Sequence, residues 1–306
     1  RDSPDTYNGE LYLELHRGTL TNQHQIKRNN RLSEIALHNL EYLTVYNAVE
    51  GHAKASDEAY RDLTETLLVN QFHDILPGTC IPRAHQESLA ATGELLQKAG
   101  SLIREAASPA QAEEQVTVIN PTSFARSDVL YLDYVPGMKV RGNYPQQITE
   151  TLEGGKKLAV AGVELPPYGS VVLTLEPGEP DGRAPFGISG RDLVTPFAQV
   201  TFDERGFMKS FKDTEADREL AGEGYPLNTF LVAEDLPSAW DNWDVDADLQ
   251  MKFKDCAEFL SSEVISKGAV ELRIRNKYRI TEKSTITQDV IFYASSPLVK
   301  FETMMD

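Results

Sequence analysis

Two kinds of hydrophobic pattern meet at the stretch Pro109-Ala110-Gln111-Ala112-Glu113-Glu114-Gln115-Val116-Thr117-Val118-Ile119. On its N-terminal side, apolar residues recur at the three- and four-residue spacing of amphipathic helices. From Val116 onward, apolar and polar residues alternate, which is typical of β-strands. The polar run 109–115 therefore predicts a linker between a helical domain and a β-domain.

Three helices are predicted before the linker. The first ends near Gly51, because glycine after the last periodic residue is a common helix stop. The second begins at Ser56, whose hydroxyl is a good N-cap, and continues to the Pro77-Gly78 pair. The third runs from Pro82 to the Ser108-Pro109 pair. We expect the helices to form a bundle whose core is lined by Leu32, Ile35, Ala36, Leu40, Leu43, Leu63, Leu67, Leu68, His85, Leu89, Thr92, Leu96, Ala99 and Ile103.

The rest of the chain predicts many strands with no helical pattern between them. Such an order favours an antiparallel β-sandwich over a parallel α/β sheet. The segment Asp203-Glu204-Arg205-Gly206 has the composition of a hairpin turn. The strand candidates are 116–119, 129–134, 157–163, 170–175, 197–202, 208–211, 230–233, 269–280 and 285–293, with strand-like alternation also at 10–15 and 299–305. We therefore expect an α+β multidomain chain, with a connecting segment at 1–24, a three-helix domain at 25–108 and a β-sandwich at 109–306.

Charge and composition exclude several classes of partner. The 306 residues include 30 Lys and Arg against 47 Asp and Glu, which gives a net charge of −17. Such a chain repels nucleic-acid phosphates and anionic lipids, so we expect neither nucleic acid nor membrane as a partner. No apolar run approaches the roughly 20 residues of a membrane-spanning helix. Cys80 and Cys256 lie far apart and lack metal spacing, which favours a reducing, cytoplasmic location.

A polar motif lies where the second helix is expected to end. The run Asn70-Gln71-Phe72-His73-Asp74-Ile75-Leu76-Pro77-Gly78-Thr79 places an imidazole beside a carboxylate just before the Pro-Gly stop. Borderline divalent metals accept both groups as ligands, and a helix end allows both to point into a cleft. A lone His-Asp pair at a helix end is more often a solvated or capping pair, because a cationic His interacts favourably with a helix C-terminus. The residues alone leave both interpretations open.

Several segments together resemble the class II α-mannosidases of glycoside hydrolase family thirty-eight, in its cytosolic, vacuolar and bacterial branch. The motif at 70–81 is similar to the family segment that enters the active site. The segment from Gly9 to Thr19 resembles the one that closes the family's catalytic barrel, and Lys27, Asn30, Arg31 and Glu34 fit the helix that follows it. Signposts of the family's β-domain resemble the segments 120–121, 125–129, 166–169, 240–244 and 301–303.

The resemblance implies a retaining α-mannosidase that hydrolyses terminal α-mannosides of oligosaccharides with one divalent metal, zinc or cobalt. In it, His73 would be a metal ligand, and Asp74 would hydrogen-bond mannose hydroxyls in the subsite where the bond is cut. Phe72 stands where Golgi and lysosomal relatives have a second histidine, and it supplies no ligand. The nucleophile and the acid/base would lie in an N-terminal catalytic barrel preceding Arg1, so this chain alone is expected to be inactive and to bind metal poorly. The resemblance also implies a mutarotase-like β-domain, incomplete at its C-terminus, and frequent oligomerisation.

Other functions and roles remain compatible with the residues. One is a non-catalytic carbohydrate-binding or scaffold module. Another is a metal-independent hydrolase acting through Asp241 and Asp244, which requires those carboxylates to lie about 5 Å apart in a cleft. His16 and Arg17 are candidates either for the floor of the cleft or for a strand end. The cluster from Trp240 to Asp248 resembles a sugar-stacking surface or a calcium loop, although it lacks EF-hand spacing. A loop packed against the helical bundle or the catalytic barrel is the favoured interpretation.

Overall fold

Three long helices followed by antiparallel sheets form the described part of the computed structural model, as the sequence predicts. The described residues are 6, 8, 14–49, 51, 57–107, 114–180 and 182–306. They divide into two compact units. Unit 1 comprises residues 1–110 and 233–252, and unit 2 comprises residues 111–232 and 253–306.

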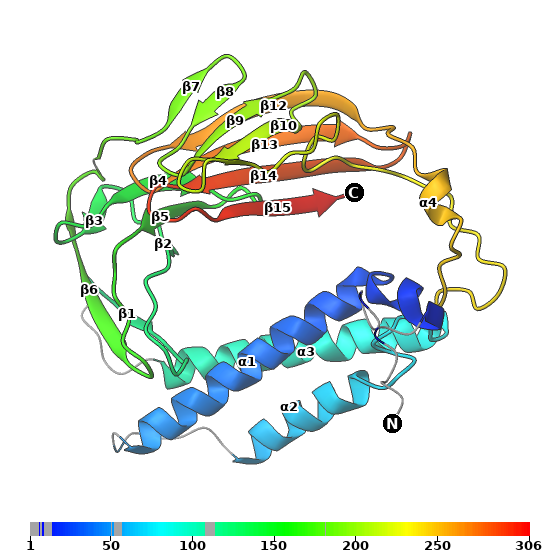
Figure 1. The fold of residues 1–306 in the computed structure, drawn as a ribbon. Helices are drawn as coiled ribbons and strands as arrows, with labels where there is room; N and C mark the ends of the chain where they lie inside the picture. Colours follow the sequence, from blue (N-terminus) through cyan, green and yellow to red (C-terminus); the bar gives the residue numbers. More distant parts are fainter. Residues whose placement is uncertain are drawn as a thin grey trace, which may run out of the picture. The chain divides into compact units, whose positions relative to one another are not determined.

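Unit 1 is built on α1 (His24–Val49), α2 (Asp57–Asn70) and α3 (Pro82–Ala106). Figure 1 shows these helices side by side, and each contacts the other two. Their shared apolar core contains Leu37, Leu40, Leu63, Leu67, Leu95 and Ala99. The predicted N-cap Ser56 lies outside the described residues. No helix in the described ranges is both long and apolar enough to cross a membrane.

The predicted core face of the bundle is wrong in part. Three residues of the predicted apolar stripe are exposed instead, namely Leu32, Ile35 and Leu68. The core includes buried polar residues, and Asn29 Nδ2 donates a hydrogen bond to Thr92 Oγ1 at 3.0 Å. Because such a pair is satisfied internally, it can occupy a core position that an apolar pattern assigns to solvent.

The end of α2 also differs from the prediction. The helix ends at Asn70, and residues 71–78 continue as a series of turns. The Gln71 N–H is shared between the carbonyls of Leu67 and Leu68, at 3.0 and 3.2 Å. This shift toward three-residue hydrogen bonding is how a last helical turn tightens and ends. The Pro77-Gly78 pair therefore ends the turns rather than the helix.

Unit 2 consists of four antiparallel sheets in the described residues. Their strands are β1 (Gln115–Ile119), β2 (Leu130–Asp133), β3 (Met138–Val140), β4 (Gln146–Glu150), β5 (Lys156–Val160), β6 (Ser170–Pro177), β7 (Gly187–Ser189), β8 (Asp192–Val194), β9 (Ala198–Phe202), β10 (Met208–Asp213), β11 (Arg218–Glu219), β12 (Glu258–Lys267), β13 (Glu271–Arg279), β14 (Thr285–Tyr293) and β15 (Val299–Met305). The strand orders are β1-β6-β3, β2-β5-β4, β11-β10-β9-β8-β7 and β12-β13-β14-β15.

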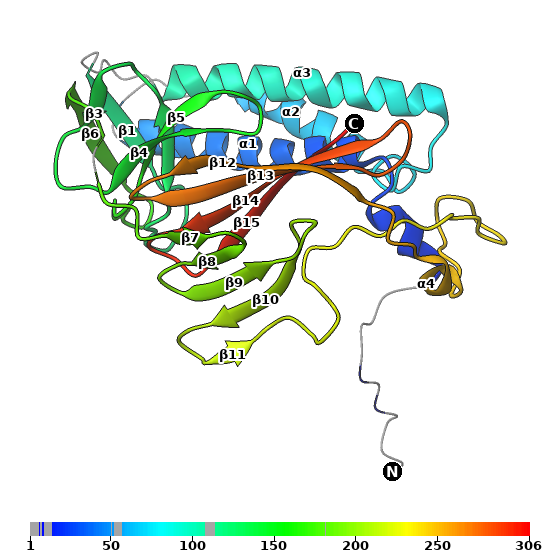
Figure 2. The same cartoon turned by 90° about the horizontal axis from the view of Figure 1, so that it is seen from above.

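The sheets pack in pairs over apolar cores. The β1-β6-β3 sheet faces the β2-β5-β4 sheet through residues that include Leu158 and Leu173. The β7–β11 sheet lies next to the β12–β15 sheet in Figure 2, and residues such as Val200 and Leu272 pack between them. This packing confirms the predicted antiparallel sandwich.

Individual strands agree less evenly with the sequence pattern. The predicted strand at 230–233 is wrong, because only Val232 pairs there, in an isolated bridge with Lys254. The predicted hairpin turn between β9 and β10 is confirmed. Asp203 Oδ1 accepts the backbone N–H of Arg205 at 2.8 Å, and Gly206 takes a φ of +78°. A positive φ of this kind is costly for any residue with a Cβ, so the glycine is needed at that point.

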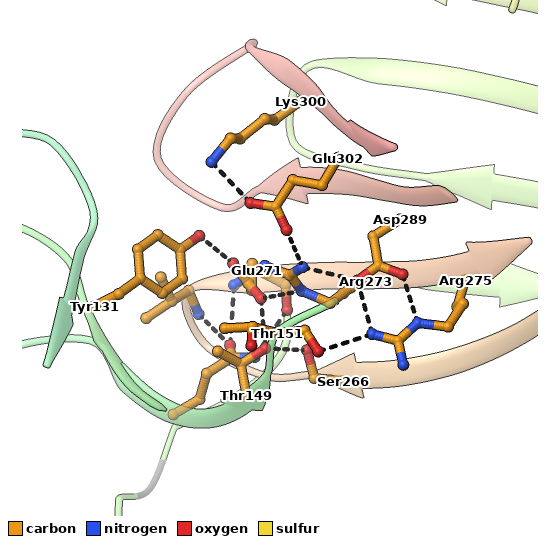
Figure 3. Close-up of polar contacts among 12 residues, drawn as sticks. Tyr131, Thr149, Thr151, Ser266, Glu271, Arg273, Arg275, Asp289, Lys300 and Glu302 are labelled. Carbon is orange, nitrogen blue, oxygen red and sulfur yellow. Dashed lines mark hydrogen bonds and ion pairs between the residues drawn. The ribbon is translucent and has the colours of Figure 1, made fainter. Parts of the chain in front are cut away.

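A buried ionic network links the β12–β15 sheet to the β2-β5-β4 sheet (Figure 3). At its centre, Arg273 donates to Glu271 Oε1 at 3.1 Å, to Asp289 Oδ2 at 2.9 Å and to Glu302 Oε2 at 2.7 Å. Thr149 of β4 donates to Glu271 Oε1 at 2.6 Å. Arg273 is only 1% exposed. Since burying an unpaired charge is costly, the network fixes how these two sheets face each other.

Candidate functional site

His73 and Asp74 lie in the turns that follow α2. The N–H of Ile75 donates to Phe72 O at 2.9 Å, and the N–H of Thr79 donates to Asp74 O at 3.1 Å. The segment is therefore a folded turn held by its own backbone. It presents the pair at the end of the helix, where the sequence places it.

Both side chains of the pair reach solvent. The imidazole is 73% exposed and the carboxylate 49% exposed, with His73 Nε2 at 3.5 Å from Asp74 Oδ2. This distance suits an ion pair when the imidazole is protonated, but it is long for a hydrogen bond. The Phe72 ring lies 4.2 Å from the imidazole between centroids, and Thr79 Oγ1 donates to Asp74 Oδ1 at 3.3 Å. The pair is thus oriented by its neighbours while its outer faces remain accessible.

Lys27 fastens the turn to the start of α1. Its ammonium donates to the carbonyls of Leu76 and Pro77, both at 3.1 Å, and to Asn22 O at 2.7 Å. Burial lowers the pKa of Lys27. Charge-assisted hydrogen bonds of this kind are among the stronger ones in proteins. One cation therefore holds both the helix start and the far end of the turn.

Gly78 allows this close approach. Its φ is +83°, and a Cβ built there would lie 2.8 Å from Gln23 Cβ. Such a distance is shorter than a van der Waals contact, so a larger residue would push the turn away from α1.

The near end of the turn is anchored to α1 as well. Gln71 Nε2 donates to Asn30 Oδ1 at 2.9 Å and to Glu34 Oε1 at 3.1 Å. Asn30 Nδ2 also donates to Glu34 Oε1, at 3.0 Å. Both ends of the turn are therefore tied to the same helix, which makes it a rigid support for the His-Asp pair.

The N-terminal segment is helical where the sequence predicts a strand. Residues Glu14–Leu20 form η1, a 3-10 helix that contains His16 and Arg17. Residues 10–13 of the predicted strand lie outside the described part. The His16 ring meets the Trp243 ring edge-on, with centroids 5.2 Å apart. Of the two roles considered for His16, a strand end is wrong, because the residue lies in a 3-10 helix and its ring packs against Trp243. A place in the cleft floor stays a prediction.

The Trp240–Asp248 cluster is a loop packed against η1. The Gly18 N–H donates to Trp243 O at 2.9 Å, and a Cβ at Gly18 would lie 3.0 Å from the carbonyl oxygens of Asn242 and Asp244. For this reason residues 233–252, with the short α4 (Leu249–Lys252), group with the helical unit, although the sequence assigns them to the β-domain.

The carboxylates of that loop serve its own conformation. Asp244 Oδ1 accepts the N–H of Val245 at 2.8 Å, and Asp246 Oδ2 accepts the N–H of Ser238 at 2.9 Å. Within the described ranges, no three His, Cys, Asp or Glu side chains are grouped so that they could hold a metal. Neither the calcium loop nor a hydrolytic pair at Asp241 and Asp244 gains support from this arrangement.

His73 offers one metal donor of suitable type, and the Asp74 carboxylate lies beside it. Neutral imidazole suits both zinc and cobalt, whereas a zinc site normally has four ligands. His73 therefore fits such a metal in chemistry and supplies one of the usual four ligands. Any further protein ligands would come from residues outside the described ranges or from another domain.

The sequence pattern does not reveal the supports of this site. It marks Lys27 only as a helix residue and Gly78 only as part of a helix stop. The available signal was a lysine in the first turn of α1, a position where acidic residues are usual because of the helix dipole. Its partners, the carbonyls of Leu76 and Pro77, lie about fifty residues away in the sequence, at separations of 49 and 50.

Comparisons with known proteins agree with this architecture. Residues 14–109 match the model of the alpha mannosidase middle domain, and residues 193–306 match the model of the glycosyl hydrolases family 38 C-terminal domain. Human alpha-mannosidase 2C1 is 28% identical over 310 residues, which cover 97% of this chain and 28% of the human protein. The alpha-mannosidase of Saccharomyces cerevisiae is 25% identical over 296 residues, which cover 95% of this chain and 24% of the yeast protein.

A solved structure supports the fold. The crystal structure of an alpha-mannosidase from Enterococcus faecalis has a TM-score of 0.67 with this chain, at 14% identity, over 94% of this chain and 41% of that one. The helical and β-domains thus have the order found in mannosidase-type glycoside hydrolases. The chain belongs to glycosyl hydrolase family 38, in which it corresponds to the middle and C-terminal domains. It spans about a quarter of the length of its curated relatives, between 24% and 28% in the human and yeast proteins.

Proposed function

We propose that this chain forms part of a retaining, metal-dependent α-mannosidase that hydrolyses terminal α-mannosides of oligosaccharides. His73 acts as one ligand of a divalent metal, zinc or cobalt, and Asp74 accepts hydrogen bonds from mannose hydroxyls. The observation that carries the proposal is the accessible His-Asp pair on a turn anchored at both ends, in a chain of family 38. Rigid support of this kind is what a binding residue needs in order to hold its geometry.

The proposal assigns the two catalytic carboxylates to a barrel domain N-terminal to Arg1. A retaining glycosidase needs a nucleophile and an acid/base about 5 Å apart. The metal, when bound, stabilises charge that develops near the reacting sugar. His73 contributes a neutral imidazole to that metal, and Asp74 orients the sugar by accepting hydrogen bonds from its hydroxyls. The partners of the chain are then the oligosaccharide, the barrel domain and, in an oligomer, a second copy of the chain.

The proposal includes a cytoplasmic location. Cys80 and Cys256 are both free thiols, which suits a reducing compartment.

The test of the proposal is an Asp74→Asn variant of the protein extended by its natural upstream sequence. The extended protein is expected to hydrolyse 4-nitrophenyl α-mannoside. The variant should lose about ten- to a hundredfold in kcat/KM, because hydrogen bonds to a charged group contribute about 1.5–3 kcal/mol. Its metal content should stay unchanged. Asp62→Asn, an exposed residue of α2, is the matched control and should keep full activity. An unchanged kcat/KM in Asp74→Asn refutes the role given to this carboxylate.

A further inference from the structure

Unit 2 contains a cavity that is separate from the His-Asp pair. Its volume is about 410 Å³, and it lies where the β12 edge of one sheet faces the β7–β9 part of the other. The floor comes from β12 and β13, and the wall includes Asp203, Glu204 and Gly206 of the hairpin turn described above. Cavities that bind small molecules commonly measure about 300–1,000 Å³.

An unpaired buried amide lies in the floor of this cavity. Asn276 is 1% exposed, and among the residues that the structure describes neither its Oδ1 nor its Nδ2 has a hydrogen-bond partner. Leaving such a group unsatisfied costs about 1–3 kcal/mol. Buried polar groups in proteins are therefore nearly always paired, and an exception on a cavity wall points to an absent partner.

The cross-strand neighbours of Asn276 show that the strand pairing does not by itself leave a side-chain amide unpaired. Asn276 stands opposite Ser262 on β12 and opposite Gln288 on β14, and Gln288 stands opposite Thr303 on β15. Gln288 is satisfied, because Asn228 donates to its Oε1 at 2.6 Å and its Nε2 donates to Thr303 at 2.9 Å. Ser262, Asn276, Gln288 and Thr303 thus form a row across the four strands. At its β12 end, Ser262 and Asn276 line the cavity.

A glycine keeps the cavity open next to the amide. A Cβ at Gly206 would lie 3.0 Å from Tyr278 Oη, 3.3 Å from the Phe259 ring and 3.5 Å from Asn276 Cγ. Tyr278 is also fully buried, and its hydroxyl has no hydrogen-bond partner in the described part of the chain. Burial raises the pKa of Tyr278, so the group is a neutral hydroxyl. Two neutral polar groups on the same face of β13 are thus left without partners at one place.

The charged groups around the cavity are already engaged. Arg191 pairs with Glu204 at 3.2 Å, and Asp192 Oδ1 accepts the hydroxyl of Thr201 at 2.8 Å. Asp203 Oδ1 accepts two backbone N–H groups of its own turn. The remaining lining is largely aromatic or aliphatic, and includes Phe202, Phe259, Val264 and Ile274. A ligand for this cavity is therefore neutral, with an apolar surface and adjacent groups that both donate and accept hydrogen bonds.

We propose that the cavity binds a neutral monosaccharide unit through a pair of adjacent hydroxyls. One hydroxyl donates to Asn276 Oδ1, and its neighbour accepts from Asn276 Nδ2. The C–H surface of the sugar packs against the aromatic lining. This site is non-catalytic, and it does not depend on the metal or on His73.

The test measures binding of methyl α-mannopyranoside to the whole chain by isothermal titration, with cyclohexanol as a probe that lacks the adjacent hydroxyls. We expect weak, saturable binding of the mannoside, insensitive to a metal chelator, and none of cyclohexanol. Asn276→Leu should weaken binding at least about tenfold, since two hydrogen bonds are lost. The same variant should fold normally and match or exceed the wild type in thermal stability, because it removes an unsatisfied buried amide.

A second variant tests the cavity independently, in case Asn276→Leu does not fold. Ser262→Trp fills the mouth of the cavity from an exposed strand position and should also abolish binding. Ser261→Trp is the matched control, because Ser261 pairs with Lys277 and points to the opposite face of β12, so it should bind normally.

Three results would overturn this inference. Absence of saturable mannoside binding would mean that ordered water satisfies Asn276. Equal binding by wild type, Asn276→Leu and Ser262→Trp would place the sugar elsewhere. Loss of binding in His73→Ala would assign the sugar to the His-Asp turn, and would support the proposed mannosidase site at the expense of this one.

Discussion

Glu219 shows how strongly local hydrogen bonds can tune one carboxylate. Ser210 Oγ donates to its Oε2 at 2.5 Å, and the N–H groups of Phe211 and Ala221 donate to its Oε1 at 2.7 and 2.9 Å. These bonds, with that of Ser210 foremost, lower the pKa of Glu219 to about 2. The ionised carboxylate therefore ties β10 to the end of β11, at the edge of its sheet.

A pH dependence follows from this shift. Because the pKa in the folded chain lies below the unfolded value of 4.5, Glu219 stabilises the fold above pH 4.5, and this stabilisation is lost as the pH falls toward 2. A carboxyl titration by NMR should show Glu219 titrating near pH 2. The variant Glu219→Gln should have a smaller loss of stability between pH 4.5 and pH 2 than the wild type. A titration near pH 4.5 would contradict the hydrogen bonding described for this residue.

Residues that match a helical or alternating pattern were predicted well, whereas those stabilised by distant partners were not. Leu40, Leu63 and Leu67 lie in the bundle core as predicted. Asn29 was not predicted there, because its partner Thr92 lies 63 residues further along the chain. A polar residue becomes a core residue only through such a partner, and a single sequence does not display the pairing.

Among the secondary-structure elements, the turn after α2 carries the proposed site and depends on Gly78. The substitution Gly78→Ala combines a positive φ, which costs about 1–2 kcal/mol, with a Cβ that meets Gln23 at 2.8 Å. Overpacking of this kind adds about 1–3 kcal/mol. We therefore expect a lower melting temperature of unit 1 and faster amide hydrogen exchange in residues 71–79.

Gly51→Ala is the control for that substitution. Gly51 has a φ of +75°, and apart from its own chain neighbours no atom of the described residues lies within 4 Å of the position that a Cβ would take there, so this variant carries the conformational cost without a clash of that kind. Gly78→Ala should be clearly less stable than Gly51→Ala. Equal stability of the two variants would show that the turn is not packed tightly against α1.

The strands were predicted where apolar residues alternate clearly and missed where they do not. β13 and β14 were found within two residues of their ends. β12 was missed because most of its side chains are exposed and its sequence mixes Ser and Glu with apolar residues. Its pairing with β13 supplies the hydrogen bonds that hold it as a strand, and those come from residues later in the chain.

Over the whole chain, the order of domains and the family were predicted from the sequence, while the grouping of residues 233–252 with the helices was not. That grouping depends on the close approach of Gly18 to Asn242 and Asp244, which lie more than two hundred residues further along the chain. It also depends on the hydrogen bond from Asn22 to Asn242, whose partners are separated by 220 residues. The cavity at Asn276 was also not predicted. Asn276 lies in the run RIRNKYR, which has the pattern of an ordinary charged strand, and only the cross-strand arrangement reveals its unpaired amide.

The stability of unit 2 depends on the charge network around Arg273. The substitution Arg273→Met leaves Glu271, Asp289 and Glu302 without their common cation, and such a loss costs about 3–5 kcal/mol. Arg279→Met is the control on the same strand, because Arg279 forms an exposed pair with Glu258 that is worth under about 1 kcal/mol. Urea unfolding followed by circular dichroism should separate the two variants. Similar midpoints would show that the network adds no stability.

The proposed shared active site is tested by the zinc content of the protein extended by its natural upstream sequence, with and without His73→Ala. His85→Ala, a histidine of α3 in the same unit, serves as the control. We predict about one metal per chain in the wild type and in His85→Ala, and loss of most of that metal together with mannosidase activity in His73→Ala. Full metal content and an unchanged rate in His73→Ala would contradict the assignment of His73 as a ligand.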